Sequence, residues 1–379
     1  MSILAYYFEA LRLSYRGQLH YEYDTLQAKH YVIPGIIDKK VGDDSQSLAT
    51  FYNVLSADYA APDSDFGYHF EAAASLKLSK DEYATPYYLR QYDIKSPNDL
   101  LVSMASIDYY ADTFSLSAGR NSVEMEWLQG STDGFIFFAQ GRNTSVRIFW
   151  IYNFYDLQPN YFVRYDAIAD GRGLYGIYAE ARLADLPLNT TGYAYTAPDH
   201  FDIYGAALSL NGPKSVTLNL AGSAAEHHQE STGFEQYWRL WAVWEPYDRH
   251  TLACGASQTG SNWLLVMLQF GAHPFTPFYR NNDIDRPRAA NAYARYGYTE
   301  KRWYVDLLYG KTQYTASQFT NSGIEAVTLS SVEADAYIGF ALSERIGLRI
   351  AWMYLDADSR DYTELDEQLI MADLTVNWP

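Results

Sequence analysis

The sequence is short of three things that large classes of protein need. Its 379 residues contain one cysteine, Cys254, so no internal disulfide can form. No apolar run approaches the roughly 18 residues of a membrane-spanning helix. Basic residues are outnumbered, with 28 Lys and Arg against 46 Asp and Glu, and the net charge of −18 argues against a nucleic-acid partner. The sequence therefore excludes a disulfide-stapled domain and a helical membrane protein, and it predicts no nucleic-acid binding.

What the sequence has in abundance is strict alternation of apolar and polar residues. From Leu11 to Asp24 the apolar side chains fall on one face of an extended chain and the polar ones on the other. The same period of two returns at 65–79 and 368–378, over segments longer than an average strand. Aromatic residues, including 36 Tyr and 9 Trp, often stand near the ends of the apolar faces, as at a membrane interface. This pattern predicts an all-β transmembrane barrel.

Counting the alternating segments predicts an antiparallel up-and-down β-barrel of about 18 strands, in a single domain over 1–379. Sixteen or twenty strands are alternatives. Short periplasmic turns, one of them at Asp170-Gly171, are expected to alternate with long extracellular loops. The segment 161–168 is counted as a strand, whereas 188–197 and 263–270 are assigned to loops, since either alone would make the number of strands odd. The residues from Tyr6 to the first strand either enter the lumen or lead directly into that strand.

The number of strands bears directly on function. Eight strands fill their interior with side chains, whereas sixteen to eighteen leave a water channel. The polar faces carry many charged residues, and an arginine facing lipid at the bilayer midplane costs about 2 to 4 kcal/mol. We therefore expect these faces to line a pore for passive diffusion of small hydrophilic solutes or ions.

One long connection has the composition of a pore constriction. It runs from Asn121 to Gly134, follows the fifth predicted strand and carries Glu124, Glu126 and Asp133. In general diffusion porins the third loop folds inward and its acids face a basic wall. By that likeness, the three carboxylates would oppose pore-lining arginines, of which the candidates are Arg16, Arg120, Arg147, Arg164 and Arg182. The alternative is that the acids are solvated and each arginine pairs with a neighbouring lumen carboxylate.

Evidence for a cofactor or for catalysis is slight. Asp283 and Asp285 lie in a patch of oxygen ligands and are candidates for binding Ca²⁺, although the spacing of an EF-hand is absent and a solvated loop is the alternative. We expect no other cofactor. No Gly-x-Ser-x-Gly motif is present, so we expect no enzyme. The alternatives to a pore are a barrel lipase or protease and a soluble secreted carbohydrate-binding β-protein.

The sequence resembles Gram-negative outer-membrane porins. The opening Phe8-Glu9-Ala10-Leu11, followed by Tyr15-Arg16-Gly17-Gln18-Leu19-His20-Tyr21, resembles the first strand of the major outer-membrane and substrate-channel porins of epsilonproteobacteria, relatives of the outer-membrane carboxylate channels. Ser117-Ala118-Gly119-Arg120 resembles the strand end that leads into their constriction loop.

This resemblance implies a location in the bacterial outer membrane, with lipid and small solutes as partners and with a homotrimer as an alternative to a monomer. The first residues do not have the pattern of a signal peptide, so we expect the mature form. One feature departs from the family, because Pro379 follows Trp378 where such barrels usually end on an aromatic residue.

Overall fold

A computed structural model describes residues 11–28, 31–33, 37–39, 44–60, 64–78, 100–158, 161–164, 167–183, 186–228, 234–262, 264, 278–279, 284–320, 323–357 and 365–378. Strands dominate these ranges. Their helical elements are two short 3₁₀ turns, Ile168–Gly171 and Pro213–Ser215. No helix within the described ranges has the length and apolar character needed to cross a bilayer.

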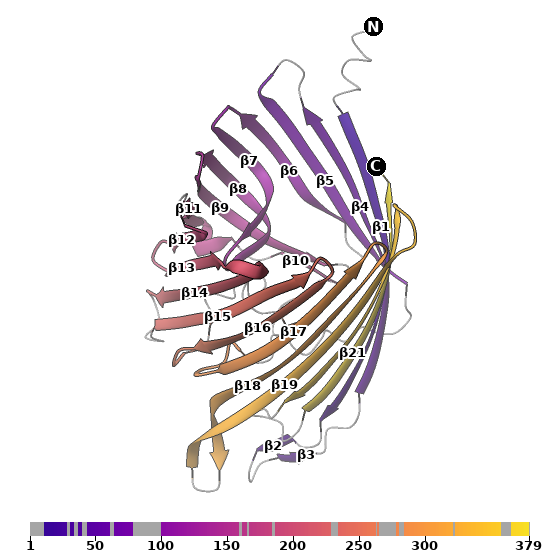
Figure 1. The fold of residues 1–379 in the computed structure, drawn as a ribbon, viewed down its shortest axis with the longest axis vertical. Coiled ribbons are helices and arrows are strands. Elements are labelled where there is room, and N and C mark those ends of the chain that lie inside the picture. Colours follow the sequence, from indigo (N-terminus) through magenta and orange to yellow (C-terminus); the bar gives the residue numbers. More distant parts are fainter. Residues whose placement is uncertain are drawn as a thin grey trace.

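Eighteen antiparallel strands form a closed ring (Figure 1). In ring order they are β1 (Leu11–Ala28), β4 (Asp44–Ala60), β5 (Phe66–Lys77), β6 (Leu100–Tyr110), β7 (Phe114–Met125), β8 (Leu128–Gln140), β9 (Thr144–Gln158), β11 (Leu174–Leu183), β12 (Leu188–Ala197), β13 (Phe201–Asn211), β14 (Val216–His227), β15 (Phe234–Tyr247), β16 (His250–Thr259), β17 (Ala290–Glu300), β18 (Trp303–Thr320), β19 (Gly323–Ala341), β20 (Ile346–Ala357) and β21 (Leu365–Trp378). Outside the ring, β2 (Tyr31–Ile33) pairs with β3 (Ile37–Lys39), and β10 (Tyr161–Arg164) pairs with the end of β9.

The first strand closes the ring by pairing on both sides. Tyr15 of β1 lies opposite Leu55 of β4 and opposite Trp378 of β21. Strands β1 and β21 therefore begin and end at the same end of the barrel, which also carries short connections such as those between β6 and β7 and between β8 and β9. We call this the turn end, and the opposite end the loop end. The predicted closed, even-stranded barrel is confirmed.

Alternation along each strand separates an apolar exterior from a polar interior. On β1, Leu19 points outward and is 43% exposed, whereas His20 points inward and is 3% exposed. Exposed tryptophans lie on the outward faces of other strands, among them Trp238, Trp244 and Trp303. Cys254, on β16, is exposed on the same outward surface. An exterior of this kind is suited to hydrocarbon with aromatic residues at its boundary.

Two errors in the predicted strands cancel each other. The segment predicted as a strand at 161–168 contributes only the four-residue β10, outside the ring, whereas Leu188–Ala197, predicted as a loop, is the ring strand β12. The turn predicted at Asp170-Gly171 is instead part of the 3₁₀ turn in the long connection from β9 to β11. Most of 263–270 and all of 1–10 lie outside the described residues. The predicted number of strands is therefore right, although two of its assignments are wrong.

Candidate pore constriction

The segment 121–134 is the distal part of a β-hairpin rather than an irregular loop. Strand β7 pairs with β6 only as far as Arg120, but its pairing with β8 continues to Met125 opposite Leu128. A two-residue turn, Glu126-Trp127, joins the strands. Beyond Arg120 this hairpin separates from β6 and folds into the barrel, while β8 stays paired with β9 as far as Ser131 opposite Tyr155. Its tip meets the inner faces of β12, β14 and β15. The expected inward fold is therefore present, in a different secondary structure.

Glycines allow the hairpin to leave the wall. Gly119 and Gly134 lie opposite each other in β7 and β8, at the level where the pairing with β6 ends. Gly119 has φ +116°, a conformation that other residues adopt only under strain. A β-carbon at Gly119 would collide with the carbonyl oxygen of Ala105, and one at Gly134 would collide with that of Trp150. Both close approaches require a residue without a side chain.

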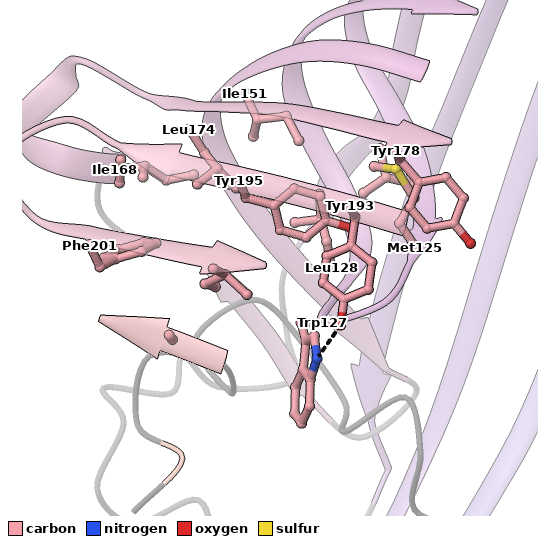
Figure 2. Packing of buried hydrophobic residues seen from close by; sticks show 14 of the residues in the cluster. Met125, Trp127, Leu128, Ile151, Ile168, Leu174, Tyr178, Tyr193, Tyr195 and Phe201 are labelled. Carbon is pink, nitrogen blue, oxygen red and sulfur yellow. Dashed lines mark hydrogen bonds between the residues drawn. The ribbon is translucent and has the colours of Figure 1, made fainter. Parts of the chain in front are cut away.

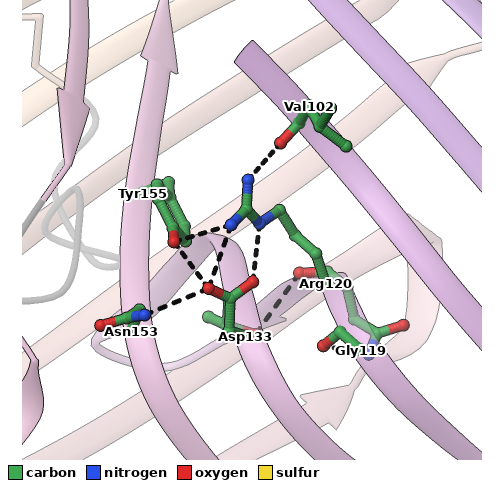
Figure 3. A network of polar contacts seen from close by, with 8 residues as sticks. Val102, Gly119, Arg120, Asp133, Asn153 and Tyr155 are labelled. Atoms are coloured by element: carbon green, nitrogen blue, oxygen red, sulfur yellow. Dashed lines mark hydrogen bonds and ion pairs between the residues drawn. The ribbon is translucent and has the colours of Figure 1, made fainter.

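A polar network fixes the base of the hairpin (Figure 3). Arg120 donates from Nε to Asp133 Oδ1 at 2.6 Å and from Nη2 to Oδ2 at 3.1 Å. Tyr155 on β9 donates to the same Oδ2 at 2.6 Å, and Asn153 donates to it at 3.2 Å. The guanidinium also lies over the Tyr155 ring, 4.0 Å from its centroid, and donates to the carbonyl of Val102 on β6 at 2.5 Å. The hairpin is thereby bonded to the strands on both sides of it.

The tip of the hairpin is held by an aromatic cluster on the inner faces of β12, β14 and β15 (Figure 2). Trp127 is 1% exposed, and its indole N–H points between Tyr193 Oη, at 3.1 Å, and Ser223 Oγ, at 2.8 Å. The indole also packs edge-on against Tyr237, with ring centroids 5.7 Å apart. Tyr195 donates to the carbonyl of Glu126 at 3.0 Å. Apolar hairpin residues such as Leu128 complete this buried cluster.

The two edges of the hairpin alternate between buried and exposed positions. Val123 and Met125 are buried, whereas Ser122 and Glu124, which alternate with them, are exposed. Gln129, opposite Glu124, is also exposed. We call Ser122, Glu124 and Gln129 the hairpin's free face. Within the described part of the chain Glu124 forms no ion pair, and it is the charged residue of this face.

Glu126 occupies a different environment, in the turn between the two strands. Burial raises the pKa of its carboxyl group above the ordinary value, while a hydrogen bond from Tyr178 and the charge of Arg147 partly oppose that shift. One carboxylate oxygen is buried and accepts no hydrogen bond from the described residues. Of the three predicted acids, Glu124 is solvated, Glu126 is partly buried at the tip, and Asp133 is paired with Arg120.

The predicted arginines whose side chains the structure describes lie in different surroundings. Arg147 lies over the rings of Phe138 and Tyr178 and pairs with Glu180 at 3.7 Å. Arg16 lies over the Tyr52 ring near the turn end, far along β1 from the loop end, and is exposed. Arg182 is exposed near the end of β11.

The remaining predicted residues give less information. The side chain of Arg164 lies outside the described residues, as does the whole of Asp283. The backbone carbonyl of Asp285 accepts a hydrogen bond from the Leu264 amide. The Ca²⁺ site predicted for Asp283 and Asp285 therefore stays a prediction.

Inward-facing ion pairs on the barrel wall remain in contact with solvent. Arg295 pairs with Asp306 across β17 and β18, and the arginine side chain is 49% exposed although it points inward. Arg349 pairs with Asp373 at 2.7 Å and is 45% exposed. Charged groups inside a barrel keep such exposure only where the interior admits water.

Solved structures with a similar architecture are known, although the sequence comparisons found no match. No protein-family model matches the chain, and no curated protein matches its sequence. Among solved structures, OccK3 (OpdO) of Pseudomonas aeruginosa has a TM-score of 0.71, 12% identity and 100% coverage of both chains. OccAB1 of Acinetobacter baumannii has a TM-score of 0.71 and 13% identity, covering 97% of each chain. OpdK of P. aeruginosa with vanillate has a TM-score of 0.68 and 11% identity, covering 97% of this chain and 99% of that one. These structures are porins of the outer-membrane carboxylate channel group.

The chain has their fold. Identities this low extend the likeness to the porin fold and no further. Within that fold, sequence reasoning missed the residues that hold the hairpin tip. Trp127, Tyr193 and Ser223 come from three separate strands or turns, and no spacing in the sequence links them. A second inward segment was also missed: Phe278, in the connection between β16 and β17, packs on Tyr293 and Leu308 of the inner wall.

Proposed function

We propose that this protein is an outer-membrane porin, a single barrel domain over residues 1–379 that passes small hydrophilic solutes or ions by passive diffusion. The observation that carries the proposal is a closed ring of eighteen strands with an apolar exterior and solvated ion pairs inside. A ring of this width has room for water beside an inward hairpin. Transport of this kind requires no cofactor and no catalytic group.

The proposal is tested by recording currents across planar lipid bilayers. Refolded protein should insert in discrete steps of equal, ohmic conductance, and protein denatured before addition should give no steps. A correctly folded barrel that never conducts would contradict a porin function. Water-soluble, monodisperse protein in the absence of detergent would contradict the membrane location.

We further propose that the constriction favours cations over anions. Four inward arginines are neutralised by a neighbouring carboxylate: Arg120 by Asp133, Arg147 by Glu180, Arg295 by Asp306 and Arg349 by Asp373. Glu124 on the free face has no such partner in the described chain, so the uncompensated charge of the hairpin is negative. Charged side chains at a narrow site select ions of opposite sign. The arginines Arg16 and Arg182, near the turn end, would affect ions only beyond this site.

The cation preference is measured as a reversal potential under a salt gradient. Glu124→Gln should move it toward the anion value, whereas Glu226→Gln, at an exposed position near the end of β14, should leave it unchanged. A wild-type channel that prefers anions would contradict the proposal while leaving the porin function intact. The solved OpdK structure contains vanillate, an aromatic carboxylate. In this chain the inward arginines named above are paired with carboxylates, which favours cations rather than a carboxylate solute.

The branch of porins that this chain resembles is proposed from its sequence. The resemblance at residues 8–21 supports the epsilonproteobacterial branch, and we propose that branch on the sequence alone. The homotrimer stays a prediction.

A further inference from the structure

The turn at the hairpin tip contains a residue that its backbone conformation disfavours. Trp127 has φ +61°, in the left-handed region, at the second position of the two-residue turn. Glycine or asparagine is the usual residue there, because a β-carbon crowds the backbone and a bulky side chain is an outlier. Such conformations persist where the surroundings over-determine them, and they gather at functional sites. The turn alone would therefore favour glycine over tryptophan.

The contacts of the indole explain why a tryptophan stands in this turn. Its N–H is shared between Tyr193 Oη of β12 and Ser223 Oγ of β14, and these two oxygens are themselves 2.6 Å apart. The ring packs edge-on against Tyr237 of β15. None of these strands is a neighbour of β7 or β8 in the ring. The indole therefore joins the hairpin tip to a part of the wall that backbone pairing does not reach.

The remaining attachments of the hairpin lie at its base, along β9, with which β8 pairs as far as Ser131, and at the tip. The network of Arg120, Asp133 and Tyr155 bonds the hairpin to its own neighbours, β6 and β9. At the tip, hydrogen bonds from Tyr195 to the Glu126 carbonyl and from Tyr178 to the Glu126 carboxylate act beside the indole, together with apolar packing. A simple apolar side chain at position 127 would supply packing but would leave the pair Tyr193 and Ser223 without its shared donor.

We propose that Trp127 is a positioning residue that anchors the hairpin tip to β12, β14 and β15 and so fixes the free face of Ser122, Glu124 and Gln129 in the pore. The effect on the pore rests on the proposed porin function, because the fixed free face would set the width of the constriction. The anchoring of the tip itself does not depend on conduction. When the anchor is lost, the tip moves relative to the wall and the width of the constriction fluctuates.

A spin label on the hairpin tests the anchor directly. Gln129→Cys in a Cys254→Ala background places the label beside the tip, on an exposed residue. Trp127→Phe keeps a ring but removes the N–H, and Trp127→Gly removes the anchor while suiting the left-handed turn. Trp150→Phe is the matched control, because its indole N–H also donates one hydrogen bond, to the Arg172 carbonyl at 3.0 Å, but lies on the outward face.

We expect the mobile fraction of the label to rise about fivefold in Trp127→Phe, the factor that corresponds to one lost hydrogen bond, and further in Trp127→Gly. Trp150→Phe should match the wild type. An unchanged label spectrum in folded Trp127→Phe overturns the proposal, and this variant decides the matter if Trp127→Gly fails to fold.

Single-channel recordings then separate this inference from the proposed function. The Trp127 variants should show frequent excursions between conductance levels on a barrel whose resistance to unfolding matches that of Trp150→Phe. Steady currents identical to the wild type overturn the anchor's role in the pore. A wild-type protein that does not conduct overturns the porin function, while the label spectra still decide whether the tip is anchored.

Discussion

Replacement of Asp133 by asparagine tests whether the polar network at the hairpin base holds the constriction. The carboxylate accepts from both Nε and Nη2 of Arg120, and its Oδ2 also accepts from Tyr155 and Asn153. An asparagine amide presents an NH₂ group to part of this ring of donors. The variant therefore loses the ion pair, and its NH₂ group faces N–H or O–H donors of the neighbouring residues. The guanidinium of Arg120 keeps its charge.

The expected magnitude follows from the burial of the pair. Removing one partner of a buried ion pair costs about 3 to 5 kcal/mol, whereas exposed pairs contribute about 0 to 1 kcal/mol. The side chains of Arg120 and Asp133 are 19% and 28% exposed, so the pair lies between these limits. We expect Asp133→Asn to lower the free energy of unfolding by about 2 kcal/mol. The unpaired Arg120 should also move the reversal potential toward anions.

Asp306→Asn is the matched control. Asp306 accepts from Nε of Arg295 at 2.8 and 3.0 Å, which repeats the arginine–aspartate geometry on the plain wall of β17 and β18. Because the Arg295 side chain is 49% exposed, this variant should lose less than about 1 kcal/mol. Both are measured by urea-induced unfolding in lipid vesicles.

A double variant separates the loss of the ion pair from the cost of leaving the Arg120 charge unpaired. Arg120→Gln with Asp133→Asn should recover part of the lost stability, because neither charge is then left alone. Equal losses in Asp133→Asn and Asp306→Asn, with an unchanged reversal potential, would refute the reasoning.

Three further predictions concern the rest of the hairpin. Neutralising Glu124 and Glu126 together should shift the reversal potential toward anions more than neutralising Glu124 alone; equal shifts would remove Glu126 from the ion path. Because burial raises the pKa of Glu126, acidification should neutralise this carboxylate above the pH range of ordinary carboxylates, and the cation preference should begin to fall there. Glu126→Gln should abolish this first phase in a pH series of reversal potentials. Gly119→Ala should push the hairpin out of the lumen, raise single-channel conductance and cost about 1 to 2 kcal/mol, because its β-carbon meets the Ala105 carbonyl at φ +116°. Gly192→Ala, where nothing lies within 4 Å of a β-carbon, should change neither quantity, and a Gly119→Ala channel of normal conductance would contradict the proposed bend.

Much of the barrel follows from the sequence because its main signal is local. A period of two identifies each strand with strong contrast between faces, and closure of the ring demands an even number. The weak strands show the limit of this signal. In β12 the inward residues Tyr193 and Tyr195 are aromatic, and the outward residues Gly192 and Ala194 are small, so the two faces differ little in polarity. With 161–168 counted as a strand, parity assigns 188–197 to a loop, and the two errors preserve the total.

The inward fold of 121–134 is predicted by likeness to general diffusion porins, but its hairpin structure is not, because alternation alone does not show what buries the apolar side. Val123 and Met125 alternate with Ser122 and Glu124 as residues of a strand should, yet their apolar side faces other side chains inside the barrel rather than lipid. Burial against protein and burial in a membrane select the same residue types, so alternation predicts the strand without its destination.

Physical strain provides a clue that alternation lacks. A tryptophan in a left-handed turn and a glycine whose missing side chain faces a carbonyl are each disfavoured in an ordinary membrane hairpin, where a smooth wall requires neither. Together they bend the strands at the base and hold them at the tip. These two conformations therefore lie at the base and at the tip of the segment that folds into the barrel, and strained backbone of this kind gathers at functional sites.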